Sequence, residues 1–507
     1  MIQVDMFEVG LGSALLLQFE TASGPVRVLA DAGVDRDFDD DHAKAPIEAA
    51  IAGFSDGAKR IDLVIGTHYD ADHLKGLVPI IEDTSIAIGE AWLPPVANDV
   101  RMRVGAKPRD EDLLALQLAN AELREAVLLE YLRAQAATIQ FVRRLGDEAS
   151  GWGLERLRER RFVATRLTDQ PDVADDALLA RDGFFERVER ETEERLGAPT
   201  SHVDQDLDTL HREDPDEAFR RFRRARYFSH AEFDEVTTSL ELIVKSAATR
   251  AITAKWLAAV VKALKDRKLP IRCAIIEDGE PRRFIWNASG KRFEPNAQAS
   301  SDGPVLTLLG PSKGLVAKQW DKLPVGEYLA RASFGLGKPE PITESNQLSY
   351  VALFEQDAQK LLVCGDAGFV DFKPEGRNTS FHPKLLACLS SVHVVQVAHH
   401  GGYNKFFYFG LIDAGYDKQT EPSFLLLSHA EDDKTRPNEQ FGRFIELVRS
   451  PRRELSILFT SQPLEPHVRD FKALVAPVVG ASPATRSDLR LIHDPAGWQI
   501  TKHAIQI

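Results

Sequence analysis

Short apolar runs, each closed by a turn or by polar residues, set the strongest limit on how this chain can fold. Near the start they include "SALLLQFETASGPVRVLADAG" and "RIDLVIGTHYD", and later "LSYVALFEQ", "KLLVCGDAG" and "VHVVQVAHHGG". Runs of this length, rich in leucine and β-branched residues, predict buried strands. Residues 15–19 and 26–30 flank a short turn and predict a hairpin. The sequence therefore predicts a β-rich domain.

The apolar runs fall into two blocks, and the sequence between them has a different character. Residues 108–146 carry leucines at helical spacing, with acids early and arginines late, and charge-rich sequence continues from there. We therefore expect one domain in two parts, residues 1–104 and 265–470, with a helical insertion over residues 105–264. Residues 471–507 are expected to form a C-terminal β extension, with a small hairpin from "LRLIHD" and "GWQITKH".

The composition of the chain excludes several classes of protein. The chain has 507 residues and a formal net charge of −14, which argues against a protein that coats nucleic acid electrostatically. No apolar stretch approaches the roughly 18 residues that a membrane span needs. The first residues lack a basic head and an apolar signal core, so we expect a cytoplasmic protein that has no membrane partner. Its three cysteines are too far apart in sequence for a disulfide framework or a paired-cysteine zinc site.

The segment "THYDADHLKG" places two histidines and two aspartates within six consecutive positions, directly after the apolar run "IDLVIG". We expect this cluster in the loop at the C-terminal end of a buried strand. Alternate residues of an extended loop point the same way, so His68 and Asp70 can face one metal ion. Asp72 and His73 then face a second ion.

Three later strand ends supply further ligands. Asp366 closes "LLVCGD", where it can bridge two ions, and His399 and His400 close "VHVVQVAHH". Of these two histidines we favour His399, the first after the strand. Asp31 closes "VRVLAD", where it either caps the turn or orients a ligand histidine.

These motifs resemble those of the metallo-β-lactamase fold superfamily. His68-x-Asp70-x-Asp72-His73 is similar to its His-x-His-x-Asp-His signature, with Asp70 at the second histidine, as in the branch resembling the hydrolase domain of the DNA-uptake protein ComEC. In the same order, "LLVCGDAG" resembles that branch's "LLTGD", and "VAHHGG" its "HHGS". "NQLSYVALFE" resembles its N-x-x-S-L-V-L strand, with Asn346 at the asparagine. The resemblance covers residues 1–100 and about 265–465 and leaves out the insertion.

The resemblance implies an α/β (α+β) chain with a four-layer αββα core, in which the two parts form a metallo-hydrolase domain. It implies a hydrolase with two divalent ions, zinc or manganese, that activate a water molecule. The carboxylate of Asp70 makes the site harder and shifts the preference toward manganese. Catalytic roles are expected for Asp72 and Asp366.

Two departures from the family pattern concern the edges of the site. Where the branch has "G-H-P", this chain has "TRPNE", so Arg436 is expected to contact a phosphate, with His429 as a second candidate. The superfamily usually has another ligand histidine before the bridging aspartate. In this chain the histidines in that interval are those of the insertion, namely His202, His211 and His230.

The sequence is compatible with three functions. The leading one is a metal-dependent phosphodiesterase or nuclease that acts on nucleic acid or a nucleotide phosphodiester. The second is a hydrolase of a small lactone, amide or thioester, because the same chemistry attacks a carbonyl group. The third is an interaction protein with a degenerate site, whose insertion binds a protein partner. The arginine-rich segment at 219–228 is either a nucleic-acid contact or a solvated helix face.

Overall fold

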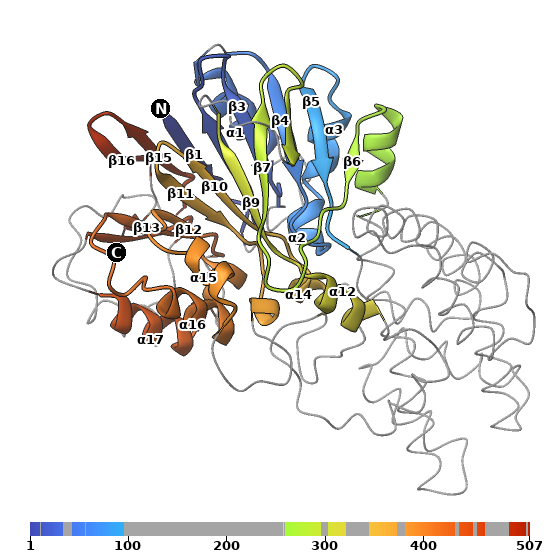
Figure 1. Cartoon of the computed structure of the whole chain (residues 1–507). Coiled ribbons are helices and arrows are strands. Elements are labelled where there is room, and N and C mark those ends of the chain that lie inside the picture. The colour runs from blue at the N-terminus through green and yellow to red at the C-terminus, as the bar shows by residue number, and fades with distance from the viewer. Residues whose placement is uncertain are drawn as a thin grey trace, which may run out of the picture.

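The computed structural model has a mixed α/β architecture with two large mixed sheets and several helices (Figure 1). The residues that it describes are 1–10, 12–33, 43–55, 57–95, 257, 259–295, 303–320, 344–372, 381–430, 436–449, 454–461, 486–502 and 505–506. The predicted insertion over residues 105–264 lies outside them, except for helical residues at 257 and 259–264. The arginine-rich segment 219–228 therefore also lies outside the described residues.

The first sheet contains eight described strands, and its central strands run parallel. In spatial order these are β16 (Gly497–Lys502), β15 (Leu489–Asp494), β1 (Ile2–Met6), β2 (Leu15–Phe19), β3 (Val26–Ala30), β4 (Arg60–Ile65), β5 (Ala87–Trp92) and β6 (Ile271–Arg272). Strands β2 and β3 form the antiparallel hairpin that the sequence predicts, and β3 to β6 are parallel. The hairpin of β15 and β16 extends this sheet beside β1.

The second sheet contains nine described strands and also combines antiparallel and parallel pairing. In spatial order these are β17 (Ile505–Gln506), β14 (Leu455–Phe459), β13 (Ser423–Leu427), β12 (Val394–Gln396), β11 (Gln359–Val363), β10 (Val351–Gln356), β9 (Val305–Gly310), β7 (Arg282–Asn287) and β8 (Arg292–Pro295). Strands β11 to β14 are parallel. Their carboxyl ends therefore meet at one edge of the sheet.

Helices accompany both sheets (Figure 1). They are α1 (Lys44–Ala52), α2 (Ala71–Leu74), α3 (Leu77–Glu82), α12 (Lys313–Trp320), α14 (Glu344–Gln347), α15 (Pro383–Cys388), α16 (Lys405–Asp413) and α17 (Glu439–Val448), with 3₁₀ turns η2 (Val370–Phe372) and η3 (Ala398–Gly401). No described helix combines the length and the apolar character that crossing a membrane requires.

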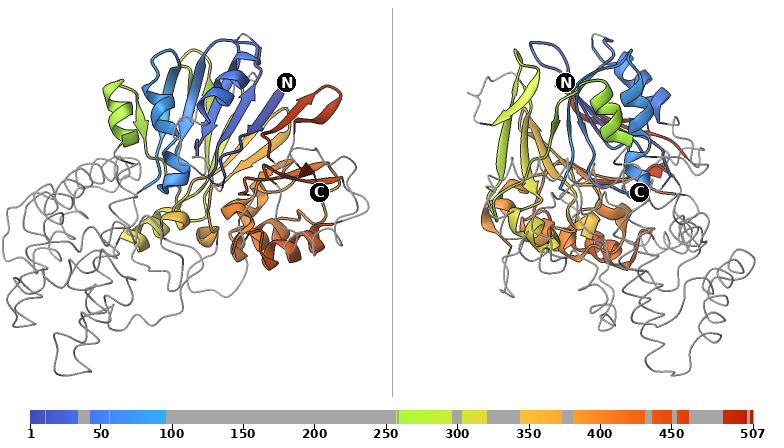
Figure 2. Two further views of the ribbon diagram at one scale, coloured as in Figure 1. Left: turned by 180° about the vertical axis from the view of Figure 1, so that it is seen from behind. Right: turned by 90° about the vertical axis from the view of Figure 1, so that its right-hand side faces the viewer.

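The centre of the first sheet is buried on both faces, as the burial of every residue in β1, β2 and β3 shows. Successive side chains of a strand point to opposite faces, and Val28 and Leu29 of β3 accordingly belong to different hydrophobic clusters. Leu29 packs in the cluster that contains Ile47 of α1 and Ile80 of α3. Val28 packs in the cluster that contains Leu308 of the second sheet and residues of α15 to α17. The right-hand view of Figure 2 shows the blue helices on the side of the first sheet away from the second.

One buried tyrosine connects the two sheets beside the loop that carries the histidine and aspartate cluster. Tyr350, directly before β10, is 1% exposed, and its hydroxyl donates to the carbonyl of Leu93 at 2.7 Å. The same hydroxyl accepts the backbone N–H of Ala274 at 3.0 Å, and the Tyr350 N–H donates to the carbonyl of Thr67 at 2.9 Å. The hydroxyl of buried Tyr69, by contrast, has no hydrogen-bond partner among the described residues.

We therefore expect Tyr350→Phe to lower the free energy of unfolding by about 1–3 kcal/mol, because two buried backbone groups lose their partner. Tyr69→Phe, the matched control, should change it by no more than about 0.5 kcal/mol. Urea unfolding followed by circular dichroism measures both values. Equal effects of the two substitutions would show that the Tyr350 hydroxyl does not join the sheets energetically.

Candidate metal centre

The predicted site residues follow parallel strands of both sheets. Asp31 follows β3 and His68 follows β4, while Asp366 follows β11, His399 follows β12 and His429 follows β13. Carboxyl ends of neighbouring parallel strands lie at the same edge of a sheet, which is where α/β proteins commonly bind ligands. The two sheets face each other, so these edges bring side chains from both halves of the chain together.

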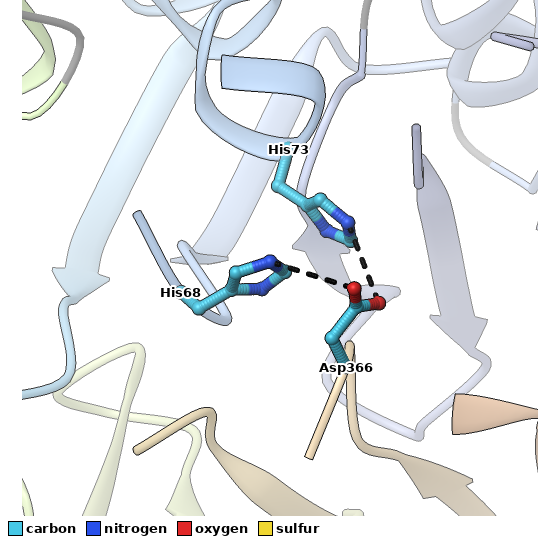
Figure 3. Close-up of side chains that lie close together, drawn as sticks. All are labelled: His68, His73 and Asp366. Atoms are coloured by element: carbon cyan, nitrogen blue, oxygen red, sulfur yellow. Dashed lines mark ion pairs between the residues drawn. The ribbon is translucent and has the colours of Figure 1, made fainter. Parts of the chain in front are cut away.

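The Asp366 carboxylate lies at the centre of this meeting point, among four imidazoles. Its Oδ2 lies 3.9 Å from Nε2 of His68 and 3.9 Å from Nε2 of His399. Its Oδ1 lies 3.6 Å from Nε2 of His73 and 3.4 Å from Nε2 of His400. Figure 3 shows His68 and His73, from the first half of the chain, pointing toward Asp366 from the second.

The buried ligand atoms of this cluster fit a metal ion. Nε2 of His68, His73 and His400, and Oδ1 of Asp366, have no hydrogen-bond partner in the part of the chain that the structure describes. Buried polar atoms without a partner are rare and costly. The separations of 3.4–3.9 Å exceed a hydrogen bond. They are close to the roughly 3.4 Å between tetrahedral ligands about 2.1 Å from an ion.

Two overlapping triplets have ligand atoms within 4.8 Å of one another. One comprises His68, His73 and Asp366, and the other comprises Asp72, His73 and His400. His73 has one ring nitrogen left to bind an ion, because the other contacts Asp31, so it can serve only one ion at a time. Asp70 lies beside the first triplet, with Oδ2 at 3.7 Å from Nε2 of His68.

Asp31 orients both histidines of the first cluster. Its Oδ2 accepts Nδ1–H of His73 at 2.8 Å and the hydroxyl of Thr67 at 2.6 Å, and its Oδ1 accepts the Thr67 N–H at 2.7 Å. Because the Thr67 hydroxyl proton points to Asp31, its oxygen is left to accept Nδ1–H of His68 at 3.2 Å. Both imidazoles therefore turn Nε2 toward Asp366. Asp31 thus supports the ligands and also closes the turn after β3.

Burial and neighbouring charges set the protonation of the cluster. Burial lowers the pKa of His68 well below its usual value and that of His400 to about 3, so both imidazoles are neutral near pH 7. Burial opposes charge on His73 as well, but the Asp31 carboxylate raises the pKa of His73 to about 10. Burial also disfavours a charged Asp366, yet the surrounding imidazoles hold its pKa below the usual range. Neutral imidazoles and an ionised carboxylate are the forms that bind metals, so His68, His400 and Asp366 already have these forms, whereas His73 loses its Nε2 proton if it binds an ion.

Left-handed backbone positions shape the loops that carry the ligands. His399 and His400 have φ of 55° in η3, which turns consecutive side chains sharply after β12. Such conformations cost on the order of 1–3 kcal/mol each for residues other than glycine. Gly365 has φ of 48°, and a Cβ there would lie 2.3 Å from Oγ1 of Thr67. A glycine before Asp366 is therefore required for Thr67 to reach Asp31.

The remaining predicted residues lie around the cluster in different roles. Nδ2 of Asn346, at the C-terminal end of α14, donates to Oδ2 of Asp366 at 3.2 Å. Arg436 contacts Nε2 of His399 through Nη2 at 3.0 Å. His429 is fully buried, and its ring nitrogens contact Oγ of Ser461 and the carbonyl of Arg436. The structure thus groups His400 with the ligand triplets, whereas Arg436 contacts His399, the histidine that the sequence favours.

Two supporting residues, Thr67 and Gln396, are not among those that the sequence predicts. Thr67 completes the contacts of Asp31, and its polar side chain directly after an apolar run was a usable signal. Gln396 accepts the N–H groups of Cys364 and Gly365 through Oε1 at 2.9 and 3.0 Å, which fixes the loop before Asp366. Its Nε2 donates to Oγ of Ser13 at 2.7 Å, across to the first sheet. A glutamine within the apolar run "VHVVQVA" was the signal for this position.

Comparisons with family models and with curated proteins found no match to this chain. The residues that could bind a metal are therefore identified by their donor atoms alone. These are imidazole nitrogens and carboxylate oxygens, buried, convergent and without other partners among the described residues.

Asp31→Asn should weaken binding of Zn²⁺ or Mn²⁺ about 10- to 100-fold, because the supports that fix both imidazoles are lost. Isothermal titration of the metal-free protein measures this. Asp62→Asn is the matched control, since buried Asp62 in β4 accepts the Arg27 N–H and contacts Arg60 instead of a histidine. The control should lose stability without losing metal affinity. Equal affinities of the wild type and Asp31→Asn would contradict the role of Asp31.

Proposed function

We propose that this chain is a metal-dependent phosphodiesterase that cleaves nucleic acid or a nucleotide phosphodiester. The observation that carries the proposal is the convergence of imidazoles from both sheets on Asp366, with unpartnered ligand atoms buried at the strand ends. Divalent ions, Zn²⁺ or Mn²⁺, are the proposed cofactors. When bound, they supply Lewis acidity at a phosphoryl oxygen and a nucleophilic water near neutral pH.

Each of these side chains would have a different role. The imidazoles and Asp366 hold the ions. The carboxylates of Asp70 and Asp72, which are more exposed to solvent, supply further ligand oxygens. Asn346 fixes the orientation of Asp366 through the hydrogen bond to Oδ2. Arg436 brings a guanidinium to the same site, where it can pair with a phosphate oxygen of the substrate.

Arg436 is the reason to favour a phosphodiester over a neutral carbonyl substrate. Its side chain is half-buried beside His399, so its positive charge is only partly screened by water. A phosphodiester carries a negative charge that this guanidinium stabilises, whereas a lactone or a thioester carries none. Carboxylate ligands add to this preference, since they suit the hard ions that serve phosphoryl transfer.

The fold that we propose is the four-layer αββα arrangement of the metallo-β-lactamase superfamily, in its ComEC-like branch. Helices α1 and α3 pack on one face of the first sheet, and the other face shares its hydrophobic cluster with the second sheet and α15 to α17. This order of packed elements supports the assignment. The resemblance of the motifs around His68, Asp366 and His400 supports it independently.

The activity is tested with a panel of substrates and metals. Metal-free protein is supplemented with Mn²⁺, Zn²⁺ or Mg²⁺ and given bis-p-nitrophenyl phosphate, single-stranded DNA, duplex DNA, RNA, an ester and a lactam. We expect cleavage of phosphodiesters that is lost on chelation and restored by one of the ions. Cleavage of the ester or the lactam alone would instead identify a carbonyl hydrolase.

Asp72→Asn and Asp366→Asn should each reduce phosphodiester cleavage on the order of 100-fold or more, because each removes a charged ligand. Both amides keep the shape of the carboxyl group, so circular dichroism should show an intact fold. Asp62→Asn, a buried aspartate away from the cluster, is the control and should retain activity. Retention of more than about a tenth of wild-type activity in both site variants would place the chemistry elsewhere.

A further inference from the structure

The two oxygens of Asp366 have different surroundings. Oδ2 accepts a hydrogen bond from Asn346 at 3.2 Å, whereas Oδ1 has no hydrogen-bond partner among the described residues. The imidazoles around the carboxylate also differ. Nε2 of His73 and His400, beside Oδ1, and Nε2 of His68, beside Oδ2, have no hydrogen-bond partner among the described residues. Nε2 of His399, also beside Oδ2, contacts Arg436 instead.

The contact between Arg436 and His399 has a defined direction. A guanidinium has only donors, so Nη2 of Arg436 donates and Nε2 of His399 accepts, at 3.0 Å. Nδ1 of His399 carries the proton and lies 3.3 Å from the carbonyl of Tyr403, its acceptor. The lone pair through which His399 would bind a metal ion is therefore directed at the guanidinium.

Several elements hold Arg436 in this position. Its carbonyl lies 3.0 Å from Nε2 of His429, which is fully buried, and the backbone N–H of His429 donates to Oγ1 of Thr460 at 2.9 Å. Gly402 leaves room for the side chain, because a Cβ there would lie 3.2 Å from Nε of Arg436. The Asn438 N–H donates to the carbonyl of Gly401 at 2.9 Å and joins the two loops.

We propose that the Arg436 guanidinium takes the place of a second metal ion on the Oδ2 side of Asp366, so that the chain binds one divalent ion tightly. That ion is held by His68, His73 and Asp366, whose buried ligand atoms lie within 4.8 Å of one another and include atoms without hydrogen-bond partners in the described part of the chain. Nε2 of His400 lies next to them, 3.4 Å from Oδ1 of Asp366. The inference rests on the metal dependence of the proposed function and changes the expected number of ions from two to one.

Electrostatics favour a single ion beside Arg436. The carboxylates of Asp70, Asp72 and Asp366 surround the cluster, and the Arg436 guanidinium lies on its Oδ2 side. A second divalent ion beside Arg436 would place two cations on the same side of one carboxylate, which Coulomb repulsion disfavours in a buried site. A guanidinium also stabilises phosphate oxygens, which is one of the roles of the second ion in two-metal sites.

Metal stoichiometry tests the proposal without relying on activity. Titration calorimetry and elemental analysis after dialysis against Zn²⁺ or Mn²⁺ should give about one tightly bound ion per wild-type chain. Arg436→Met removes the guanidinium that contacts Nε2 of His399, so this variant should bind about two ions. Adding His399→Gln to it should restore the count of about one. Arg443→Met, on the exposed surface of α17, is the matched control and should leave the count unchanged.

If Arg436→Met does not fold, the single variant His399→Gln tests the same inference. It should keep the tightly bound ion, because His399 does not bind that ion in the wild type. Two ions of similar affinity in the wild type, an unchanged count in a folded Arg436→Met, or loss of the ion in His399→Gln would each overturn the proposal. A chain that binds one ion but cleaves no phosphodiester would refute the proposed function and leave this inference standing. A chain that binds no ion would overturn both.

Discussion

The approach of imidazoles from both sheets to the Asp366 carboxylate is the constraint on which the candidate centre depends. A single carboxylate with nitrogens at 3.4–3.9 Å requires the ends of β4, β11 and β12 to lie at a common edge. The hydrogen bonds of Tyr350 and Gln396 across the sheets maintain this arrangement. The hydrophobic cluster between the sheets therefore determines the distances between the ligands as much as the loops do.

Strained backbone positions occur at this edge as well as elsewhere in the described residues. Asp31, His399 and His400 have positive φ and lie within a few residues of the ends of β3 and β12. Residues other than glycine adopt this conformation only when their surroundings compensate for its cost. Hydrogen bonds from Thr67 and His73 hold Asp31 in place. Side chains that the fold already positions favour tight binding of an ion, because fewer groups have to be ordered when it binds.

The anionic substrate that we propose is compatible with a chain that is acidic as a whole. The net charge of −14 belongs to the whole sequence, while the site has the guanidinium of Arg436 beside side chains that could bind a divalent cation. Field strength at a buried site depends on nearby charges more than on the total, because water and salt screen distant charges. Binding of a phosphodiester here therefore does not require a basic surface.

Local pattern in the sequence determined the hairpin of β2 and β3 and the positions of Asp31, His68 and Asp366 after apolar strands, because strand propensity and alternation act over a few residues. The residue types themselves, histidine and aspartate, determined that the site offers imidazole nitrogens and carboxylate oxygens. Only the tertiary structure decided that His400 joins the ligand triplets while Arg436 contacts His399, and that Gln396 supports the loop before Asp366. These choices depend on the left-handed backbone of His399 and His400 and on contacts between residues distant in sequence, which no local pattern encodes.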